Sequence, residues 1–450
     1  MKTLSFKDKL GFSVGEYSSS ILWQTVMFFL PAFYTDTFLL PASTVAIMFL
    51  LVRIFDAVND PFMGIISDRT NTRWGKFRPY LLWFAIPYGM AAFLMFTAPD
   101  FSPTGKVVYA FITYTAMMVI YTAIMIPYNS IIGVISPYQE ERTSISSFKF
   151  VFAYAAGITV QILIIPMVEK FGAGNPVRGY QYTMLIFGII CVIFFLVSFF
   201  FAKEQVKPDP AIKPSVKKDL KDLSKNGPWV VLFAVSVASL TYIAIRSGVI
   251  IYYFKYFLGN EKAAGLFMAS GTLAVLAGVL PTKWLSSKLG KKNLYIISML
   301  IIAVSLCGFM LAGKNIALLY TFQIIFSLAS GPTMPLLWSM LADAADFSEW
   351  KNKRRATGLV YSATTLGQKM GLAIGGAVTM GILSLFGYIA NVDQSETSIM
   401  GIRLLMSFIP AAIALVVAVV LFFYKLDDKK VKTIEEDLTQ RRKEREIRES

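Results

Sequence analysis

Two aspartates, Asp56 and Asp60, lie in the middle of an apolar stretch, residues 43–66, that is long enough to cross a bilayer. Arg53 precedes them, and the spacing of three and four residues places all three on one helical face. An ionised group at bilayer depth costs about 2.5–3.5 kcal/mol even on lenient scales. Two carboxylates one turn apart also repel unless a cation or proton lies between them. The pattern predicts a cation site on a wet path between membrane helices. The alternative is a structural salt bridge, for instance from Asp56 to Arg53 or Lys369.

The stretch that carries this pair is one of twelve. The chain has 450 residues and is 56% hydrophobic, above the roughly 45–50% of soluble domains. Apolar runs of about 20 residues recur at 17–38, 43–66, 79–98, 107–134, 148–168, 182–201, 229–257, 263–285, 294–312, 316–341, 357–386 and 399–424. We therefore expect an all-α membrane protein with twelve transmembrane helices. No apolar segment precedes the first run, so we expect no cleaved signal peptide.

The formal charge of +15 has an explanation in topology. Lysine and arginine gather in the loops that follow the second, sixth, eighth and tenth runs, whereas 36–44, 99–106 and 388–398 are poor in both. This bias predicts that both termini lie in the cytoplasm, and it removes the need for a nucleic-acid partner. Histidine is absent, which excludes histidine proton relays and histidine-bound metals. Cys191 and Cys307 both fall inside apolar runs, so a disulfide is not expected.

The runs divide into two sets of six. We expect a six-helix bundle over 1–201, a Lys- and Pro-rich cytoplasmic linker over 202–228, and a second six-helix bundle over 229–425. The charged tail, 426–450, is expected to be a solvated helix, with partner binding left open. The halves echo each other weakly, as in 75–81 and 290–296. Parallel repeats of this kind are typical of the major facilitator fold.

Several motifs resemble one family. They are Arg53 with Asp56-Ala57-Val58-Asn59-Asp60-Pro61, Tyr34-Thr35-Asp36, Asp68-Arg69, Arg73-Trp74-Gly75-Lys76-Phe77-Arg78-Pro79, Ile126-Pro127-Tyr128, and Ala342-Asp343 with Asp346-Phe347 and Glu349. Together they resemble the glycoside–pentoside–hexuronide:cation symporters, a branch of the major facilitators that includes the melibiose carrier. The resemblance runs from Lys9 to about Tyr424.

The resemblance implies a cation site. In that family two aspartates and an asparagine of the second helix, with a threonine of the fourth, bind the coupling ion. The matching residues are Asp56, Asn59, Asp60 and Thr122. Pro61 cannot donate a backbone hydrogen bond, so it frees a carbonyl one turn back. These are hard oxygen ligands that suit Na⁺, with Asp56 and Asp60 as its charged ligands if sodium is the ion.

The family's galactoside site is not retained. Its two sugar-binding carboxylates correspond to Ser20 and Met125, and its aromatic residue corresponds to Asn129. Galactoside specificity is therefore not implied for this chain.

The remaining polar side chains predicted near the substrate lean towards positive charge. Residues expected there, some of them by the resemblance, are Glu16, Tyr17, Ser20, Tyr121, Asn129, Lys149, Arg246, Thr365 and Lys369. A basic lining could hold an anionic sugar by charge-assisted hydrogen bonds, which favours an acidic or oligomeric glycoside over melibiose. Alternatively, Lys149 and Lys369 only balance the charges of Asp56 and Asp60. Arg246 would then snorkel or form a structural ion pair. In that case the substrate would be a neutral β-glycoside or xyloside.

A third group of charges suits gating. Arg142, Asp343, Asp346 and Arg355 lie at the predicted cytoplasmic ends of spans. Ion pairs between the two halves could close the inner face and break as it opens. The alternative is that these rim charges are merely solvated.

We therefore expect a monomeric symporter that imports a glycoside, oligosaccharide or uronide with Na⁺ or H⁺. No enzyme and no cofactor are expected, because no nucleophile–base pair or phosphate loop is present. The first alternative is a cation-independent facilitator or an exporter on the same fold. The second is a membrane sensor, which would need a signalling domain larger than the predicted loop and tail.

Overall fold

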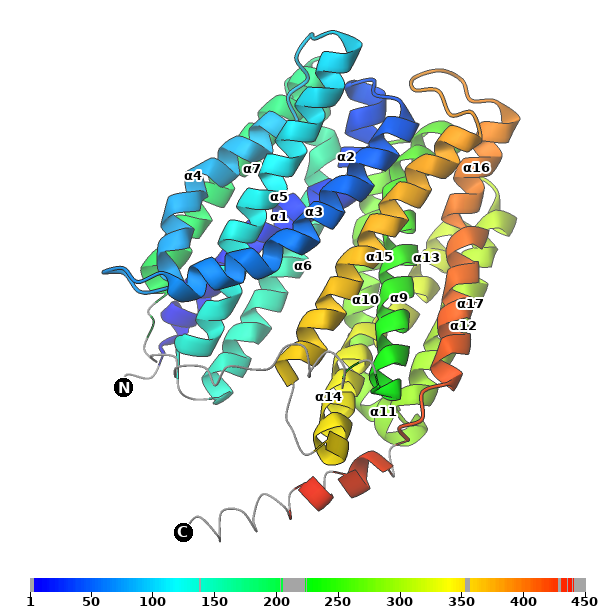
Figure 1. The fold of residues 1–450 in the computed structure, drawn as a ribbon. Helices are drawn as coiled ribbons and strands as arrows, with labels where there is room; N and C mark the ends of the chain where they lie inside the picture. The colour runs from blue at the N-terminus through cyan, green and yellow to red at the C-terminus, as the bar shows by residue number, and fades with distance from the viewer. Residues whose placement is uncertain are drawn as a thin grey trace. The chain divides into compact units, whose positions relative to one another are not determined.

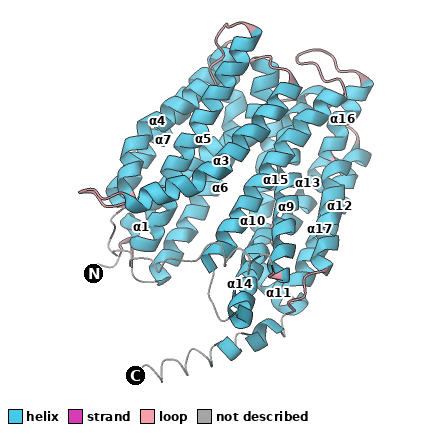
Figure 2. Ribbon diagram, in the orientation of Figure 1, coloured by secondary structure: helices cyan, strands magenta, loops and turns pink. Residues whose placement is uncertain are grey.

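The described residues form α-helices, two π-helical turns and the loops that connect them. The computed structural model describes residues 4–136, 139–202, 204, 223, 225–352 and 357–427, with 430–434, 436–438 and 440 of the tail. Within these ranges no residue belongs to a strand, and Figure 2 shows only helices and loops. This confirms the all-α expectation for the described part of the chain.

The first half of the chain contains seven α-helices and a π-helical turn among its described residues. They are α1 (Phe6–Phe28), α2 (Leu30–Ala32), the π-helix η1 (Phe33–Thr37), α3 (Ala42–Arg69), α4 (Arg78–Met95), α5 (Pro103–Val134), α6 (Gln139–Gly172) and α7 (Pro176–Phe201). Figure 1 traces them from blue to green. The helix α3 continues through Pro61, so both aspartates of the predicted cation site lie on one element.

The second half repeats this style of long helices. Its described elements are α9 (Gly227–Tyr252), the π-helix η2 (Tyr253–Phe257), α10 (Ala263–Val279), α11 (Thr282–Leu289), α12 (Lys291–Ala312), α13 (Ile316–Ser330), α14 (Thr333–Asn352), α15 (Thr357–Leu385), α16 (Glu396–Met406) and α17 (Phe408–Phe422). In each half a π-helical turn directly follows a helix, η1 after α2 and η2 after α9.

The chain forms two compact units. Unit 1 comprises Met1–Pro210, Ser247–Ala269 and Gly376–Ile402, and unit 2 comprises Ala211–Arg246, Ser270–Gly375 and Arg403–Ser450. Unit 1 thus includes parts of α9, α10, α15 and α16 besides the first half of the chain. The division into bundles over 1–201 and 229–425 stays a prediction.

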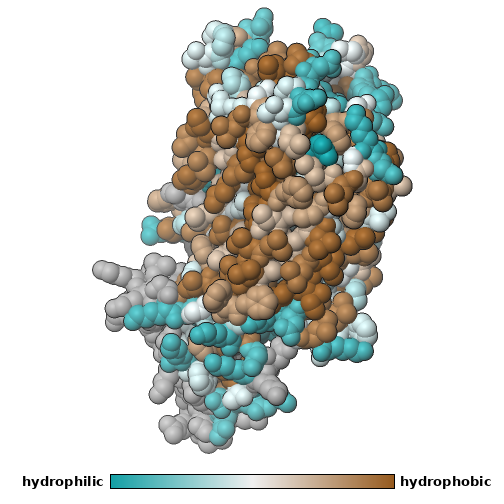
Figure 3. Space-filling view, turned by 90° about the vertical axis from the view of Figure 1, so that its right-hand side faces the viewer, coloured by the Kyte–Doolittle hydropathy of each residue, from teal (hydrophilic) through white to brown (hydrophobic). Residues whose placement is uncertain are grey.

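Nine helical segments among the described residues are long and apolar enough to cross a membrane, or ten if the bent pair α10–α11 is one span. Two further predicted spans coincide with α1 and α4. Glu16 and three consecutive serines from Ser18 make α1 more polar, and α4 begins at Arg78. The count of twelve stays a prediction. Figure 3 shows a broad hydrophobic surface between more hydrophilic ends. Exposed apolar side chains, such as those of Val419 and Phe422 on α17, are typical of a surface that faces lipid.

Small residues let the helices of unit 1 pack closely. The backbone of Gly89 on α4 meets that of Gly188 on α7, and a Cβ at Gly89 would lie 2.9 Å from the Gly188 carbonyl oxygen. Helix α1 packs against both α6 and α7. Glu16, Ser20 and Trp23, spaced four and three residues apart, form a stripe along one face of α1.

Candidate functional site

Three of the four predicted cation ligands meet in unit 1. The hydroxyl of Thr122 on α5 lies 2.9 Å from Oδ1 of Asp56 and 3.1 Å from Oδ1 of Asp60. Asp56 and Thr122 are almost completely buried, and Asp60 is half-buried. Asn59 is half-buried on the same helix. The arrangement places two carboxylates around one hydroxyl, a cluster of hard oxygen atoms suited to a small cation or a proton.

The hydroxyl cannot satisfy both carboxylates fully. A threonine carries one hydroxyl proton and two lone pairs, so it donates one hydrogen bond, shared or alternating between Asp56 and Asp60. The repulsion between the buried Asp56 and the half-buried Asp60 is therefore only partly relieved by Thr122. A bound cation could take both carboxylates and a Thr122 lone pair as ligands. That it does so stays a prediction.

A polar cluster lies further along α1 and α5. Lys149 on α6 makes an ion pair with Glu16 (Nζ–Oε2 3.1 Å) and donates a hydrogen bond to Oδ1 of Asn129 (2.6 Å). Its ammonium also lies 4.3 Å from the ring centroid of Tyr128. The side chains of Lys149 and Glu16 are only 10% and 19% exposed, so much of the lysine's charge is balanced inside the protein.

This cluster borders a cavity of about 280 Å³, which has room for a sugar ring. The cavity is lined by Glu16, Asn129, Ile132, Ser146, Lys149, Phe150 and Ala153. Three residues predicted near the substrate from the sequence, Glu16, Asn129 and Lys149, thus converge on one cavity.

An aromatic pair lies at the other end of the same stripe. Trp23 on α1 stacks on Tyr121 of α5, with ring centroids 5.5 Å apart and planes at 30°. The guanidinium carbon of Arg53 on α3 lies 4.6 Å from the Trp23 ring centroid. Tyr121 directly precedes Thr122, so the aromatic pair adjoins the carboxylate cluster along α5.

Two further residues predicted near the substrate belong to unit 1 but make other contacts. Tyr17 points towards α6 and α7, where its hydroxyl lies 2.8 Å from that of Thr159 and its ring packs on Phe194. Ser20 is buried between Glu16 and Trp23 on the α1 stripe. Their binding of substrate stays a prediction.

The other predicted substrate residues belong to unit 2. Arg246 is buried between the rings of Phe309 and Phe326, 4.8 and 4.1 Å from its guanidinium carbon, and donates a 2.5 Å hydrogen bond to Gln323. The hydroxyl of Thr365 donates to the carbonyl of Tyr361 in its own helix. Lys369 is half-buried on α15. These contacts give Arg246 a structural environment, and its contact with substrate stays a prediction.

The predicted gating residues make contacts inside their own units. Arg142 donates from Nε to the carbonyl of Ser136 (2.6 Å). Asp343 on α14 forms an ion pair with Lys291 at the start of α12 (2.6 Å). Asp346 is half-buried on α14, and Arg355 lies outside the described residues. Gating by ion pairs between halves stays a prediction.

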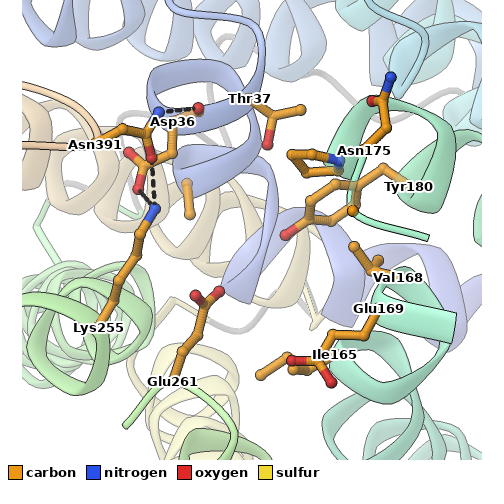
Figure 4. Close-up of a pocket in the computed structure, with 13 residues that line it drawn as sticks. Asp36, Thr37, Ile165, Val168, Glu169, Asn175, Tyr180, Lys255, Glu261 and Asn391 are labelled. Atoms are coloured by element: carbon orange, nitrogen blue, oxygen red, sulfur yellow. Dashed lines mark hydrogen bonds and ion pairs between the residues drawn. The ribbon is translucent and has the colours of Figure 1, made fainter. Parts of the chain in front are cut away.

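A polar cluster that the sequence did not identify surrounds Asp36 in η1. Its carboxylate accepts hydrogen bonds from Lys255 (2.5 Å), Tyr256 (2.6 Å) and Tyr388, and its carbonyl accepts one from Asn391 (2.5 Å). Asp36 therefore joins η1 to η2 and to the loop after α15, all within unit 1. Figure 4 shows Lys255 reaching to Asp36 and Asn391.

Burial adjusts the acidity of two groups in this region. Burial, reinforced by Tyr252 and Asp36, raises the pKa of the Tyr388 hydroxyl, so Tyr388 remains a donor to Asp36 at neutral pH. Burial also raises the pKa of Glu261, against the opposing effect of Lys255. Glu261 points into a pocket of about 320 Å³ beside Asp36 (Figure 4).

The sequence offered a partial signal for the residues that were missed. Tyr34-Thr35-Asp36 is one of the motifs behind the family resemblance, but no role was predicted for it. Trp23 gave no signal beyond its place on the stripe of Glu16 and Ser20. In both cases the partners come from distant parts of the chain, and only packing brings them together.

The family described as MFS/sugar transport protein matches residues 11–428 of the chain. A putative glycoside/cation symporter, YagG of Escherichia coli (strain K12), is 35% identical over 98% of this chain and 96% of that protein. An isoprimeverose transporter of Lactiplantibacillus pentosus is 34% identical over 94% of this chain and 89% of that protein. These relatives confirm the resemblance to glycoside and cation symporters.

The solved structures support the fold. A bacterial homologue of the human lysosomal transporter Spinster aligns with a TM-score of 0.68, 13% identity, and coverage of 97% of this chain and 99% of that one. At this identity the likeness shows the fold alone.

Proposed function

Because this chain belongs to the MFS/sugar transport protein family, we propose that it imports a glycoside together with Na⁺ or H⁺ across the bacterial inner membrane. It is a multi-pass membrane transporter and not an enzyme. The single observation that carries the proposal of coupling is the contact of Thr122 with both Asp56 and Asp60. A cation-independent facilitator has no need of two carboxylates one turn apart at bilayer depth.

Cation binding and sugar binding would be linked through this cluster. A cation neutralises the repulsion between Asp56 and Asp60, which favours the compact arrangement seen around Thr122. The adjoining face of α1, α5 and α6 then offers the sugar aromatic surface at Tyr121 and polar groups at Asn129 and Lys149. Alternating access carries both ligands, with the termini on the cytoplasmic side.

The test is uptake into proteoliposomes. Isoprimeverose is the first probe because a relative is named for it, and uptake is measured under an inward Na⁺ gradient, an inward H⁺ gradient, or neither. We expect accumulation above equilibrium under one of the gradients. Asp56→Asn and Asp60→Asn should each abolish accumulation and retain some counterflow. Asp100→Asn, in an exposed loop, is the matched control. Gradient-driven accumulation by the Asp56→Asn/Asp60→Asn double variant would refute the cation site, and equilibration without accumulation in the wild type would support the facilitator.

We further propose that the substrate is a neutral glycoside or oligosaccharide rather than a uronide. The sequence favoured an anionic sugar because of the apparent basic surplus. Glu16 now neutralises Lys149 at the cavity, and Arg246 is packed with Gln323 and two phenylalanines. An anionic sugar would have to compete with Glu16 for the ammonium group.

This second proposal is tested by isothermal titration with methyl β-glucuronide and methyl β-glucoside. The wild type should bind the neutral glycoside more tightly. In Glu16→Gln the ammonium group of Lys149 loses its carboxylate, so the preference should move towards the uronide by roughly tenfold, the effect of about 1.4 kcal/mol. Glu169→Gln removes an exposed carboxylate and is the control. Tighter binding of the uronide by the wild type would contradict the proposal.

A further inference from the structure

We propose that Trp23 transmits the state of the cation site to the sugar-binding face. This inference rests on the proposed function. Trp23 would be a positioning residue, distinct from the cation ligands and from the residues predicted to contact the sugar. Trp23 contacts both sides of the coupling. Arg53 lies over its ring, and its ring stacks on Tyr121.

Each contact leads directly to a cation-site residue. Arg53 is three residues before Asp56 on α3, the spacing at which helical side chains meet. Tyr121 is the residue before Thr122, whose hydroxyl lies within hydrogen-bond distance of Asp56 and Asp60. Two different helices of the cation site thus converge on one side chain of a third helix, α1.

Arg53 is able to change partners. It is buried, and its Nη1 donates to no atom of the described residues, although the guanidinium also interacts with the hydroxyl of Tyr114 on α5. When no cation is bound, the negative charge of Asp56 and Asp60 draws the guanidinium along its own helical face and away from the indole. When a cation neutralises the carboxylates, Arg53 rests on Trp23. A cation over the indole face favours this position by electrostatic attraction to the ring.

The consequence for the sugar lies at Tyr121. With Arg53 in place, Trp23 is held by contacts with both the guanidinium and the phenol ring, and Tyr121 is held as an aromatic surface for a sugar ring. The family's own aromatic position is Asn129 in this chain, which here binds Lys149 instead. Aromatic contact with the sugar would therefore come from the Trp23–Tyr121 pair, near the cation site.

The experiment measures coupling as a ratio of affinities. The dissociation constant of isoprimeverose, or of methyl β-glucoside, is measured by isothermal titration with and without the coupling cation. The wild type should show a ratio in the range of about 5 to 150 that is usual for coupled sites. Trp23→Leu should lower the ratio to about twofold or less. The cation should still bind without sugar, up to about tenfold more weakly, because its oxygen ligands are intact and only the Arg53–Trp23 contact of the cation-bound state is lost. Trp23→Phe, which keeps a ring, should give an intermediate ratio.

Two further variants separate this role from a general effect on folding. Arg53→Gln should lower the ratio like Trp23→Leu, and the double variant should be no worse than either single one, because both act in one pathway. Trp284→Leu is the control. It removes an exposed indole whose ring centroid lies 4.2 Å from the ammonium group of Lys288, and it should leave the ratio of affinities unchanged.

The outcomes are distinct. A Trp23→Leu protein that melts as the wild type does and keeps the wild-type ratio overturns this inference. If Trp23→Leu fails to fold, an unchanged ratio in Trp23→Phe and Arg53→Gln overturns it. A wild-type ratio of one would instead refute the proposed coupling itself. If the coupling cation changes the tryptophan fluorescence of the wild type and of Trp23→Phe by the same amount, this would also count against a role for Trp23.

Discussion

At the scale of single residues, Thr122 connects α5 to both aspartates of α3. Its one hydroxyl proton lies within hydrogen-bond distance of both carboxylates, with the hydroxyl oxygen 2.9 Å from Oδ1 of Asp56 and 3.1 Å from Oδ1 of Asp60. Its hydroxyl oxygen is therefore a potential ligand for a cation that the two carboxylates bind.

Thr122→Val keeps the shape of the side chain and removes the hydroxyl. Because hydrogen bonds to charged groups contribute about 1.5–3 kcal/mol, we expect the cation affinity to fall roughly 10- to 100-fold. Isothermal titration with the coupling cation measures this loss. Thr113→Val on the same helix, where the hydroxyl donates to the backbone carbonyls of Tyr109 and Ala110, is the control. An unchanged cation affinity in Thr122→Val would remove Thr122 from the site.

At the scale of elements, the two π-helical turns η1 and η2 meet at Asp36. Lys255 and Tyr256 of η2 both donate to its carboxylate, and Tyr388 and Asn391 add contacts from the loop after α15. The extra residue in each π-helical turn reorients the side chains that follow it, and such turns are frequent at functional positions. A single carboxylate thus holds three chain segments of unit 1 together.

Asp36→Asn should loosen these segments. The amide has no charge, so Lys255 loses its ion pair and the tyrosines lose a charge-assisted acceptor. We expect faster hydrogen exchange of backbone amides in 33–37, 253–257 and 386–391, read by mass spectrometry. Glu169→Gln breaks the exposed Lys262–Glu169 pair nearby and should leave exchange in these segments unchanged, because exposed pairs stabilise little. Equal exchange in Asp36→Asn and the wild type would show that the carboxylate is not needed there.

At the scale of the whole molecule, coupling is a property of two ligands and is reciprocal. If the cation tightens the sugar by a certain factor, the sugar must tighten the cation by the same factor. We expect the dissociation constant of the cation, measured with saturating isoprimeverose and without it, to change by the ratio found for the sugar. If the cation changes the dissociation constant of the sugar but the sugar leaves that of the cation unchanged, the two measurements do not report the same coupling.

The class of protein follows from the sequence because hydropathy is a local property. Runs of about 20 apolar residues predict membrane helices whatever their neighbours, and nine helices among the described residues meet that criterion. The spacing of Asp56 and Asp60 likewise places them on one helical face before any tertiary contact is known. Thr122 joined them through the family resemblance, since no local pattern connects α3 to α5.

Only the tertiary structure decided which partner each buried charge has. The sequence left Lys149 open to an anionic sugar or to the aspartates, and packing of α1 against α6 paired it with Glu16. No role was predicted for Asp36 or for Trp23. Asp36 accepts hydrogen bonds from residues more than 200 positions away, and Trp23 contacts side chains of two other helices. The reason is physical. The local sequence determines where a charge lies along a helix. The residue that compensates this charge depends on which helix faces come into contact when the chain folds.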